Sequence, residues 1–509
     1  MRQRWFRKIL RRRVFVILLL VIQGLILIRL IADTSSLWHW MGIGLSLVSF
    51  FAALHIINSK EKASYKLLWV FHILIFPVFG GLLYLLIRLQ KAPRMVGREL
   101  EKQICRSQAY LLDQTGSYER ACQKAPDCIP QIYYLQNNGF PVYDNTSCSF
   151  FPSGESAFSS ILEELEQASR YIFLEYFIIH EGKMWGAIHE ILKRKASQGI
   201  LVRVLYDDIG SFLTLPQDYA AQLRSEGIQC QVFNPFRPVL SAIQNNRDHR
   251  KIISIDGKVA FTGGFNLADE YINEIERFGH WKDAGLILKG EAAWSMTVMF
   301  LQMWNLSSGV QDDYAGFMPP AFSAPSGKTG LVQPYADSPV GDVHIGEHVY
   351  LQIIHQAKHY IYIYTPYLIV DETFTSALTL AARSGVDVRI VTPYHWDKRL
   401  VHMTTQAAYG ELLEAGVRIY EYTPGFLHAK MLVSDDLTAA VGTVNLDYRS
   451  LYLHFECGVW FHGNDAVCQC REDFLNTLEV SQEIMPGDCR RPLPVRVFRA
   501  LLKLWSPLF

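Results

Sequence analysis

HRKIISIDGKVAFTGGFNLADE occupies residues 249–270 of the chain, and HAKMLVSDDLTAAVGTVNLDYRS occupies residues 428–450. Both stretches begin with the pattern His-x-Lys-x4-Asp and carry an asparagine seventeen residues after the histidine. A single pattern of three common residues arises by chance in many proteins. Two copies with matched asparagines indicate an internal duplication, and this duplication guides the interpretation of the rest of the chain.

Each copy predicts a β-hairpin. In the first copy, residues 252–255 form a β-branched run that ends at Asp256 in a typical tight-turn pair with glycine, and residues 259–262 form the second strand. Alternation along an extended chain places His249 and Lys251 on the same face, and the second copy repeats this arrangement. Each copy therefore sets an imidazole beside a cation, and the glycines that follow let a ligand approach the backbone closely.

This doubled set of side chains suits a phosphodiester. Two ammonium groups would neutralise charge on the non-bridging oxygens, one imidazole would attack phosphorus, and the other would protonate the leaving alkoxide. The imidazoles are those of His249 and His428, and the ammonium groups are those of Lys251 and Lys430. Asn266 and Asn445 can each donate an amide hydrogen to the same phosphate. Asp256 and Asp435 complete the catalytic motif, but an aspartate in a hairpin turn often bonds only nearby backbone, so we expect these two to act as scaffold.

The sequence predicts neither a metal nor a cofactor. His462, Cys468 and Cys470 form an isolated cluster without the spacing of a metal site. The Gly-Lys-Thr at residues 327–329 lacks the glycine that a nucleotide-binding loop would need at Phe322, so we interpret it as a plain loop. Exchange of one phosphodiester for another conserves the bond type and needs no ATP.

The duplicated motifs, together with GGFNLADEYIN, LHAK and GTVNLDYRS, resemble the phospholipase D superfamily and its bacterial cardiolipin synthase branch, over residues 37–509. The resemblance implies two pseudo-symmetric α/β halves that share one active site, preceded by an N-terminal transmembrane helical region. It also implies an acidic partner for each histidine, Glu456 in the second half and Asp283 in the first. A carboxylate on the far ring nitrogen would fix the imidazole tautomer.

The resemblance further implies a cardiolipin synthase that joins two phosphatidylglycerol molecules and releases glycerol. His249 would form a phosphatidyl-histidine, and His428 would protonate the departing glycerol and then deprotonate the second lipid. Three alternatives stay open: a phospholipase D with water as acceptor, a nuclease, and a non-enzymatic membrane scaffold. A degenerate motif would suggest the scaffold, and both motifs are intact.

An internal repeat extends beyond the motifs. ASRYIFLEYF at residues 168–177 matches AKHYIYIYTP at 357–366, GILVRVL at 199–205 matches GVDVRIV at 385–391, and GIQCQVF at 227–233 matches GVRIYEY at 416–422. Helical patterns at 157–168 and 184–197 alternate with such apolar runs, which predicts an α/β fold with a largely covered sheet. A segment rich in Pro, Gly, Ser and Asp at 307–339 separates the halves. We therefore expect an anchor at residues 1–95 and catalytic halves at 96–330 and 331–509.

Charge and hydropathy favour a lipid partner over nucleic acid. Lys plus Arg equals Asp plus Glu at 49 each, so no global field attracts polyanions. Apolar stretches at residues 14–28, 37–57 and 67–89 predict a membrane anchor; two are long enough to span a bilayer and the first is marginal. A secretory signal is the alternative for the first stretch, but no small-x-small cleavage site follows it.

The orientation signals conflict, because basic clusters both precede the first stretch and follow the third. The clusters are Arg2, Arg4, Arg7, Lys8, Arg11, Arg12 and Arg13, and then Arg88, Lys91, Arg94 and Arg98. Three crossings cannot keep both clusters in the cytoplasm. We expect a multi-pass protein of the cell membrane with its catalytic halves on the cytoplasmic face, also because nine irregularly spaced cysteines are unlike a disulfide framework.

Residues 495–509 predict a second membrane contact, an interfacial amphipathic helix. Arg496, Arg499 and Lys503 share one helical face, and Val497, Phe498, Leu501, Leu504, Trp505 and Leu508 share the other. Packing of this helix on the protein's own core is the alternative.

Overall fold

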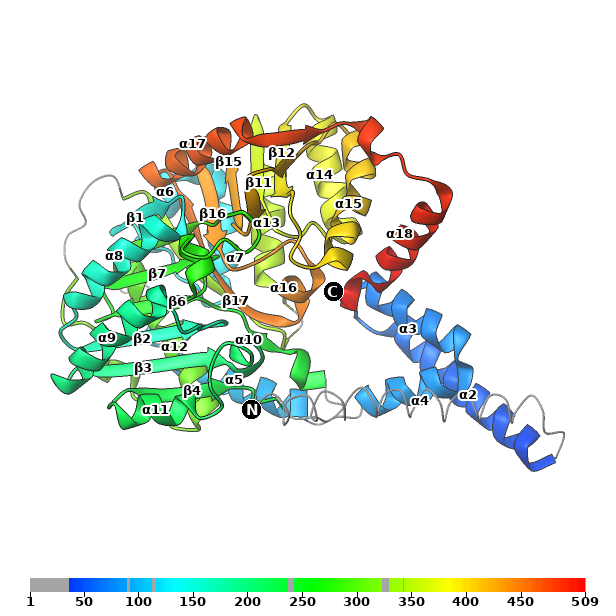
Figure 1. Cartoon of the computed structure of the whole chain (residues 1–509), viewed down its shortest axis with the longest axis horizontal. Helices are drawn as coiled ribbons and strands as arrows, with labels where there is room; N and C mark the ends of the chain where they lie inside the picture. The colour runs from blue at the N-terminus through cyan, green and yellow to red at the C-terminus, as the bar shows by residue number, and fades with distance from the viewer. Residues whose placement is uncertain are drawn as a thin grey trace. The chain divides into compact units, whose positions relative to one another are not determined.

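The computed structural model describes residues 36–88, 92–111, 116–236, 242–322, 329–341 and 343–508 (Figure 1). Within these ranges the chain divides into two compact units. One unit contains the N-terminal helices up to Met95, together with described residues of 236–245 and 503–508. The other contains nearly all of the remaining chain, including both copies of the repeated motif.

The N-terminal unit contains α2 (Ser36–Asn58), α3 (Ala63–Ile75) and α4 (Pro77–Arg88), which pack on one another. Helix α2 coincides with the apolar stretch at 37–57. The apolar stretch at 67–89 is divided between α3 and α4, because Pro77 disfavours helical backbone at the residue before it, and Phe76 adopts φ −128° and ψ 71°. The stretch at 14–28 lies outside the described residues. Of the helices described, none combines the length and the apolar character needed to cross a membrane.

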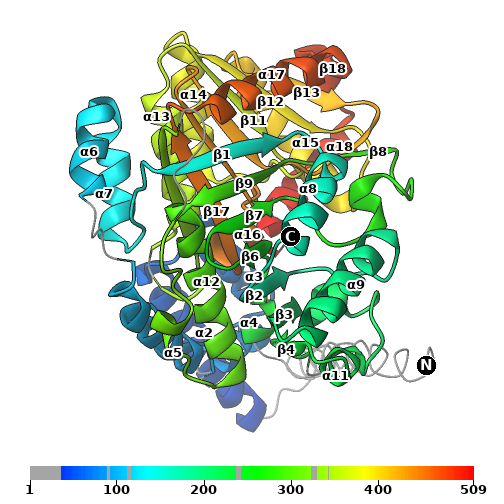
Figure 2. The same ribbon diagram turned by 90° about the vertical axis from the view of Figure 1, so that its left-hand side faces the viewer.

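The first half of the catalytic unit is built around a seven-stranded sheet. Helices α5 (Ala92–Gln108), α6 (Ser117–Lys124) and α7 (Ile129–Asn137) precede it in the chain. The elements that follow are β1 (Thr146–Phe151), α8 (Gly154–Glu166), β2 (Tyr171–Tyr176), α9 (Lys183–Ser197), β3 (Leu201–Asp207), α10 (Asp208–Ser211), α11 (Tyr219–Ser225), β4 (Gln229–Phe233), β5 (Arg247–Asp248), β6 (Ile252–Ile255), β7 (Val259–Gly263), β8 (His280–Lys282), β9 (Gly285–Gly290) and α12 (Glu291–Ser308). The strand order is β1-β9-β7-β6-β2-β3-β4, which Figure 2 shows from top to bottom.

The second half repeats this design. Its elements are β10 (Leu331–Asp337), α13 (Ile345–Gln356), β11 (Tyr360–Tyr364), α14 (Glu372–Arg383), β12 (Asp387–Pro393), α15 (Arg399–Glu414), β13 (Arg418–Tyr422), β14 (Gly425–Leu427), β15 (Met431–Ser434), β16 (Thr438–Gly442), α16 (Tyr448–Tyr452), β17 (His454–His462), α17 (Asp465–Glu479), β18 (Ser481–Ile484) and α18 (Leu493–Trp505). The strand order is β10-β17-β16-β15-β11-β12-β13-β18.

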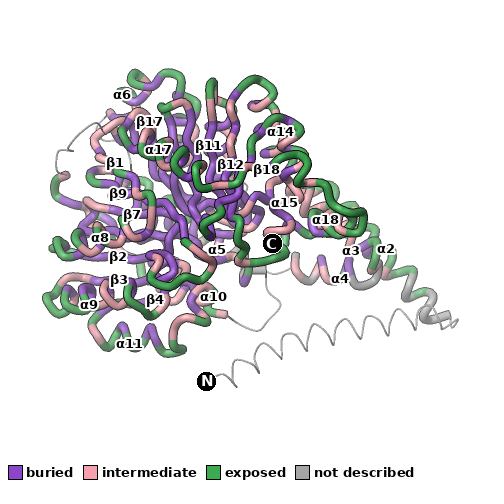
Figure 3. Tube along the Cα trace, turned by 45° about the horizontal axis from the view of Figure 1, so that its top comes forward, coloured by how far each residue is buried: buried purple, intermediate pink, exposed green. Residues whose placement is uncertain are grey.

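The two strand orders correspond position by position, apart from the extra edge strand β18. This correspondence confirms the expected pair of α/β halves, and the hairpins β6–β7 and β15–β16 are the ones the motifs predicted. Helix α12 is buried along residues 292–305 and contacts strands of both sheets, and one apolar cluster includes core residues of both halves. Figure 3 shows most strands of the two sheets buried and the outer faces of α9, α11 and α14 exposed.

Two short parallel ladders cross between the halves. Strand β5 of the first half pairs with β17 of the second, and β14 of the second half pairs with β8 of the first. Each ladder ends beside a motif histidine: His249 N donates to Phe455 O (2.9 Å), and His428 N donates to Lys282 O (2.7 Å). Each histidine is therefore held by the backbone of the opposite half.

The motif aspartates lie in the hairpin turns, at the far ends of β6 and β15 from the lysines. Asp256 and Asp435 adopt φ of 53° and 56°, a left-handed conformation that aspartate tolerates better than most residues. Asp256 accepts hydrogen bonds from the backbone N–H groups of residues 169–171 at 2.8 Å, and Asp435 accepts those of residues 358–360 at 2.7–2.9 Å. Each aspartate fastens its hairpin to the start of the neighbouring strand, which supports the scaffold role expected for both residues of the motif.

We expect Asp256→Ala to lower the free energy of unfolding by about 2–4 kcal/mol, because three strand-end N–H groups lose an ionised acceptor. Asp256→Asn keeps one acceptor oxygen and should cost less than Asp256→Ala. The measurement is urea unfolding of the full chain. Asp465→Ala, a change in the first turn of α17, is the control, and equal losses for Asp256→Ala and Asp465→Ala would contradict the scaffold role.

Candidate active site

The two motif histidines pair with carboxylates crosswise. His249 Nδ1 lies 2.9 Å and 3.0 Å from the two carboxylate oxygens of Glu456, and His428 Nδ1 lies 2.9 Å from Asp283 Oδ2. All four side chains are at least nine-tenths buried. The resemblance to the phospholipase D superfamily implied both carboxylates, but it did not show that each one contacts the histidine of the opposite half.

Both carboxylates are held rigidly. Glu456 also accepts hydrogen bonds from Thr443 Oγ1 and from Ser450 Oγ at 2.7 Å. Asp283 accepts from Ala284 N at 2.9 Å and from Trp281 Nε1 at 3.3 Å. An ionised carboxylate only accepts hydrogen bonds, so it directs the imidazole proton to Nδ1 and leaves a lone pair on Nε2. Each imidazole is thereby set up as a nucleophile or a base at Nε2.

The motif lysines lie inside the site. Lys251 Nζ donates to His249 O at 2.6 Å, and Lys430 Nζ donates to His428 O and lies 2.9 Å from His428 Nδ1. Both lysines are almost fully buried. Burial lowers the pKa of Lys251 to about 8 and, together with the charge of Lys251, lowers the pKa of Lys430 to about 7. Glu456 and Asp283 compensate the two ammonium groups only in part, and a bound anion would favour their charged forms.

The two motif imidazoles are neutral at neutral pH. Burial lowers the pKa of His428 to about 4, and burial with the nearby lysines lowers the pKa of His249 well below its usual value. The His249–Glu456 contact is therefore a hydrogen bond between a neutral ring and a carboxylate. Burial alone would raise the pKa of Asp283, but contact with His428 and Lys430 lowers it, so this carboxylate stays ionised.

The two asparagines differ in their contacts. Asn266 accepts from Ile178 N at 3.1 Å and donates to Tyr271 OH at 2.6 Å, and the Tyr271 ring lies 5.7 Å from the His428 ring. Asn445 is buried, and its Oδ1 has no hydrogen-bond partner among the described residues. The amide of Asn266 is thus engaged by a tyrosine, whereas that of Asn445 retains unused hydrogen-bonding capacity.

Two residues that the motif analysis missed flank the carboxylates at equivalent positions. Trp281 and His454 each precede their carboxylate by two residues, and their rings lie 5.2 Å from His428 and 5.5 Å from His249. Burial lowers the pKa of His454 to about 4, and in the described part of the chain neither of its ring nitrogens has a hydrogen-bond partner. The two-residue spacing on an extended strand is the signal that could have found them.

His249, His454 and Glu456 present ligand atoms within 4.8 Å of one another. A cation placed there would compete with the hydrogen bonds that Glu456 already accepts and would face two lysines. We therefore assign this group to imidazole orientation. The second cluster considered from the sequence consists of His462, Cys468 and Cys470. In it, His462 Nδ1 contacts Thr438 Oγ1 at 2.9 Å. All nine cysteines of the chain are free thiols.

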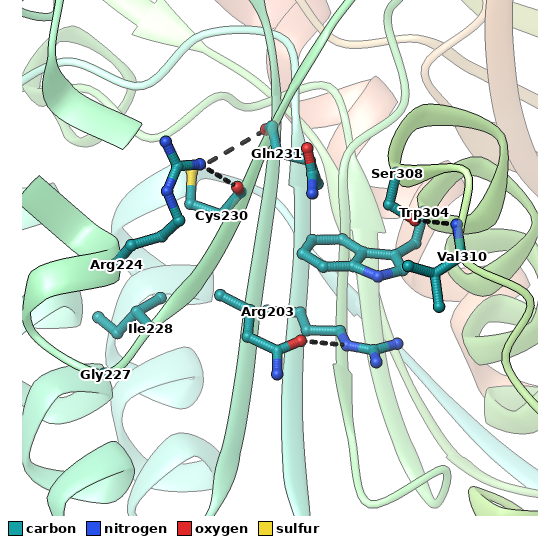
Figure 4. A pocket seen from close by; sticks show the side chains of 10 residues that line it. Arg203, Arg224, Gly227, Ile228, Cys230, Gln231, Trp304, Ser308 and Val310 are labelled. Carbon is teal, nitrogen blue, oxygen red and sulfur yellow. Dashed lines mark hydrogen bonds between the residues drawn. The ribbon is translucent and has the colours of Figure 1, made fainter. Parts of the chain in front are cut away.

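A cavity of about 420 Å³ opens at the edge of the first sheet, along residues 227–231 (Figure 4). In the second half, β18 covers the equivalent edge by pairing with β13. Arg203 in this cavity is held by Asp312 at 2.7 and 3.1 Å and lies over the Trp304 ring, and Arg224 donates to Cys230 O at 2.8 Å. These cations are already used in the fold, so the cavity is not assigned to the chemistry of the site.

A family model described as cardiolipin synthase, phospholipase D-like domain, matches residues 161–304 and 350–478. The chain belongs to the cardiolipin synthase family. A second model, described as phospholipase D-nuclease N-terminal, matches residues 47–88.

Similar proteins extend over nearly the whole length of this family member. An uncharacterised protein of Streptococcus mutans is 41% identical over 90% of this chain and 99% of its own. Cardiolipin synthases of Geobacillus sp. strain WCH70 and Geobacillus kaustophilus are 36% and 35% identical, over 93% and 97% of this chain and 96% and 99% of theirs. The crystal structure of a phosphatidylserine synthase from Haemophilus influenzae has the same fold, with a TM-score of 0.57 at 14% identity, over 74% of this chain and all of that one.

The lysines predict the pH dependence of this family member. We expect kcat/KM to fall as pH rises through about 7 to 8, because kcat/KM reports the free enzyme and Lys430 and Lys251 lose their charge there. The variant Lys430→Arg keeps a cation at all these pH values, so its profile should fall only at higher pH, whatever its absolute rate. The exposed Lys358→Arg is the control. An unchanged limb in Lys430→Arg would contradict the assignment.

Proposed function

We propose that this protein is a cardiolipin synthase that transfers a phosphatidyl group from one phosphatidylglycerol to another and releases glycerol. The observation that carries the proposal is the crosswise pair of histidines, each with a carboxylate at Nδ1 and a lysine beside it. This arrangement supplies two Nε2 atoms and two cations, as a two-step displacement at one phosphorus requires.

In the first step, Nε2 of His249 attacks phosphorus, and the bond from phosphorus to the oxygen of the headgroup glycerol breaks. His428 transfers a proton to that oxygen, and glycerol leaves. A neutral His428 could not do this, but the negative charge of a bound phosphate raises the pKa of an adjacent imidazole. Substrate binding therefore prepares the acid.

In the second step, His428 accepts the proton of a hydroxyl on the second phosphatidylglycerol. The oxygen attacks phosphorus, the bond from phosphorus to His249 breaks, and the lone pair of His249 is restored. Lys251 and Lys430 hold the non-bridging oxygens in both steps, with Asn445 and Asn266 beside them. Glu456 stabilises the imidazolium character of the phosphorylated His249.

We also propose that residues 1–95 hold the enzyme at the cell membrane, with multiple crossings, and that the halves at 96–330 and 331–509 act on the cytoplasmic side. The apolar stretches, the basic residues that follow the third stretch and the free cysteines support this arrangement. Helix α18 adds a surface contact: Val497, Phe498 and Leu501 are exposed, while Arg499 donates to Gln406 Oε1 at 2.8 Å. Arg499 is thus engaged by the protein, so the cationic face is smaller than the sequence indicates.

The test of the activity is product analysis with labelled phosphatidylglycerol and the purified full chain. Cardiolipin plus glycerol is the expected outcome. Phosphatidic acid as the main product would identify a phospholipase D, and no product, with cleavage of DNA instead, would identify a nuclease.

The division of labour between the histidines predicts where a covalent intermediate forms. With a phosphatidyl ester of an acidic phenol, His428→Ala should accumulate an adduct on His249, because the leaving group no longer needs the general acid that typically contributes about 100- to 10,000-fold. His249→Ala should form no adduct. The modification is mapped by mass spectrometry under alkaline conditions.

The exposed His359→Ala is the matched control and should turn over without accumulating adduct. An adduct on His428 in the His249→Ala protein, with none on His249 in the His428→Ala protein, would reverse the assignment.

Helix α18 predicts a difference between lipid formats. Replacing Val497, Phe498 and Leu501 by serine should lower turnover on vesicles about tenfold more than on detergent-dispersed lipid, because only the vesicle format requires surface docking. Measured rates in the two formats decide the question. Equal losses would mean that the helix stabilises the catalytic unit and does not dock.

A further inference from the structure

Two loops that follow equivalent strands expose large apolar side chains. The first continues from β3 through α10 and exposes Ile209 (39%) and Leu213 (74%). The second continues from β12 and exposes Tyr394 (45%), Trp396 (50%) and Leu400 (47%). Parallel strands carry functional loops at their carboxyl ends, so the duplication places one such loop in each half.

Contacts place the first loop beside the first histidine. Ser211 Oγ donates to Phe177 O at 3.3 Å and accepts from Ile179 N at 3.1 Å. The Phe177 ring lies 5.1 Å from the His249 ring. Lys251 Nζ lies 5.7 Å from the centre of the Phe177 ring. Phe177 therefore connects the loop that carries Leu213 to the imidazole of His249.

The second loop is held at the site in an equivalent way. Tyr367 OH donates to Asp397 Oδ2 at 2.6 Å, and Lys398 Nζ lies 5.3 Å from the centre of the Tyr367 ring. The next residue along the chain, Leu368, bridges to Leu446, directly after the phosphate-binding candidate Asn445. In the first half, Ile179 bridges in the same way to Leu267, directly after Asn266.

The charged residues of the second loop indicate what kind of surface its apolar side chains contact. Lys398 and Arg399 are exposed on the second loop, next to Trp396. Aromatic and aliphatic side chains interleaved with cations are typical of surfaces that enter the interfacial region of an anionic bilayer. A phospholipid whose phosphate is buried at the histidines must also keep its acyl chains out of water, and the two loops offer apolar surface beside the site.

We propose that the loops at residues 208–213 and 394–400 form an apolar rim that inserts into the surface of an anionic lipid bilayer and lets the lipid phosphate reach His249 and His428. The proposal rests on the proposed function for its substrate. The rim belongs to the catalytic unit and is distinct from the N-terminal helices and α18.

The test uses the full chain in vesicles of phosphatidylglycerol and phosphatidylcholine, with single substitutions Leu213→p-benzoylphenylalanine and Trp396→p-benzoylphenylalanine. After irradiation, mass spectrometry measures the fraction of each protein crosslinked to lipid. Leu437→p-benzoylphenylalanine is the matched control: Leu437 is similarly exposed at 51%, but it lies in the β15–β16 turn, at the opposite end of β15 from Lys430. Crosslinking does not depend on turnover.

Positions 213 and 396 should crosslink to lipid several-fold more than position 437. Comparable crosslinking at all three positions, or its absence at 213 and 396, would overturn the proposal. In addition, Leu213→Ser with Trp396→Ser should lose about tenfold more activity on vesicles than on monomeric dihexanoyl phosphatidylglycerol, whereas Leu437→Ser should behave like the wild type in both formats. Equal losses in the two formats would also count against the rim.

The apolar rim and the synthase activity are contradicted by different outcomes. A protein that crosslinks to lipid at 213 and 396 but yields no cardiolipin supports the rim and contradicts the synthase activity. A protein that makes cardiolipin without those crosslinks retains the activity and loses the rim.

Discussion

The crosswise hydrogen bonds from His249 to Glu456 and from His428 to Asp283 are the interactions on which the arrangement of the catalytic unit depends. Each needs the backbone of one half to enter the other, and the β5–β17 and β14–β8 ladders provide that entry. The carboxylates are buried, which is costly unless donors surround them, and Thr443, Ser450, Trp281 and the imidazoles supply those donors. Neither half by itself contains a motif histidine together with the carboxylate that contacts its Nδ1. A single-half relative would need a two-fold dimer to build one site.

The sequence predicted the parts of this design that have local signals. Tight-turn pairs and β-branched runs predicted the hairpins, and the position-by-position repeat predicted two similar sheets. It did not predict which carboxylate meets which histidine, because strand alternation says nothing about pairing between halves. The break between α3 and α4 at Phe76 did have a local signal, the proline at position 77. Hydropathy averaged over the whole apolar stretch does not reveal this proline. His454 was missed because it carries no motif, and the contact of Arg499 with Gln406 joins residues far apart in sequence.

The two halves are similar in backbone and different in chemistry. At equivalent positions the first half has the indole of Trp281, which donates to Asp283, and the second half has the imidazole of His454, whose Nδ1 lies 3.6 Å from Glu456. The sheet edges also differ, since only the second carries an added strand. Duplication therefore supplied two equivalent frames, and side-chain differences within them distinguish the two histidines.

Burial lowers the pKa values of the motif lysines and imidazoles, and a phosphate that binds beside them favours their protonated forms. Phosphate binding must then draw protons from the surrounding water, and substrate affinity is thermodynamically linked to the local proton concentration. The negative potential of an anionic bilayer concentrates protons at its surface along with other cations. Phosphate binding at this site is therefore favoured at the surface of an anionic bilayer, where the proton concentration is higher than in bulk water.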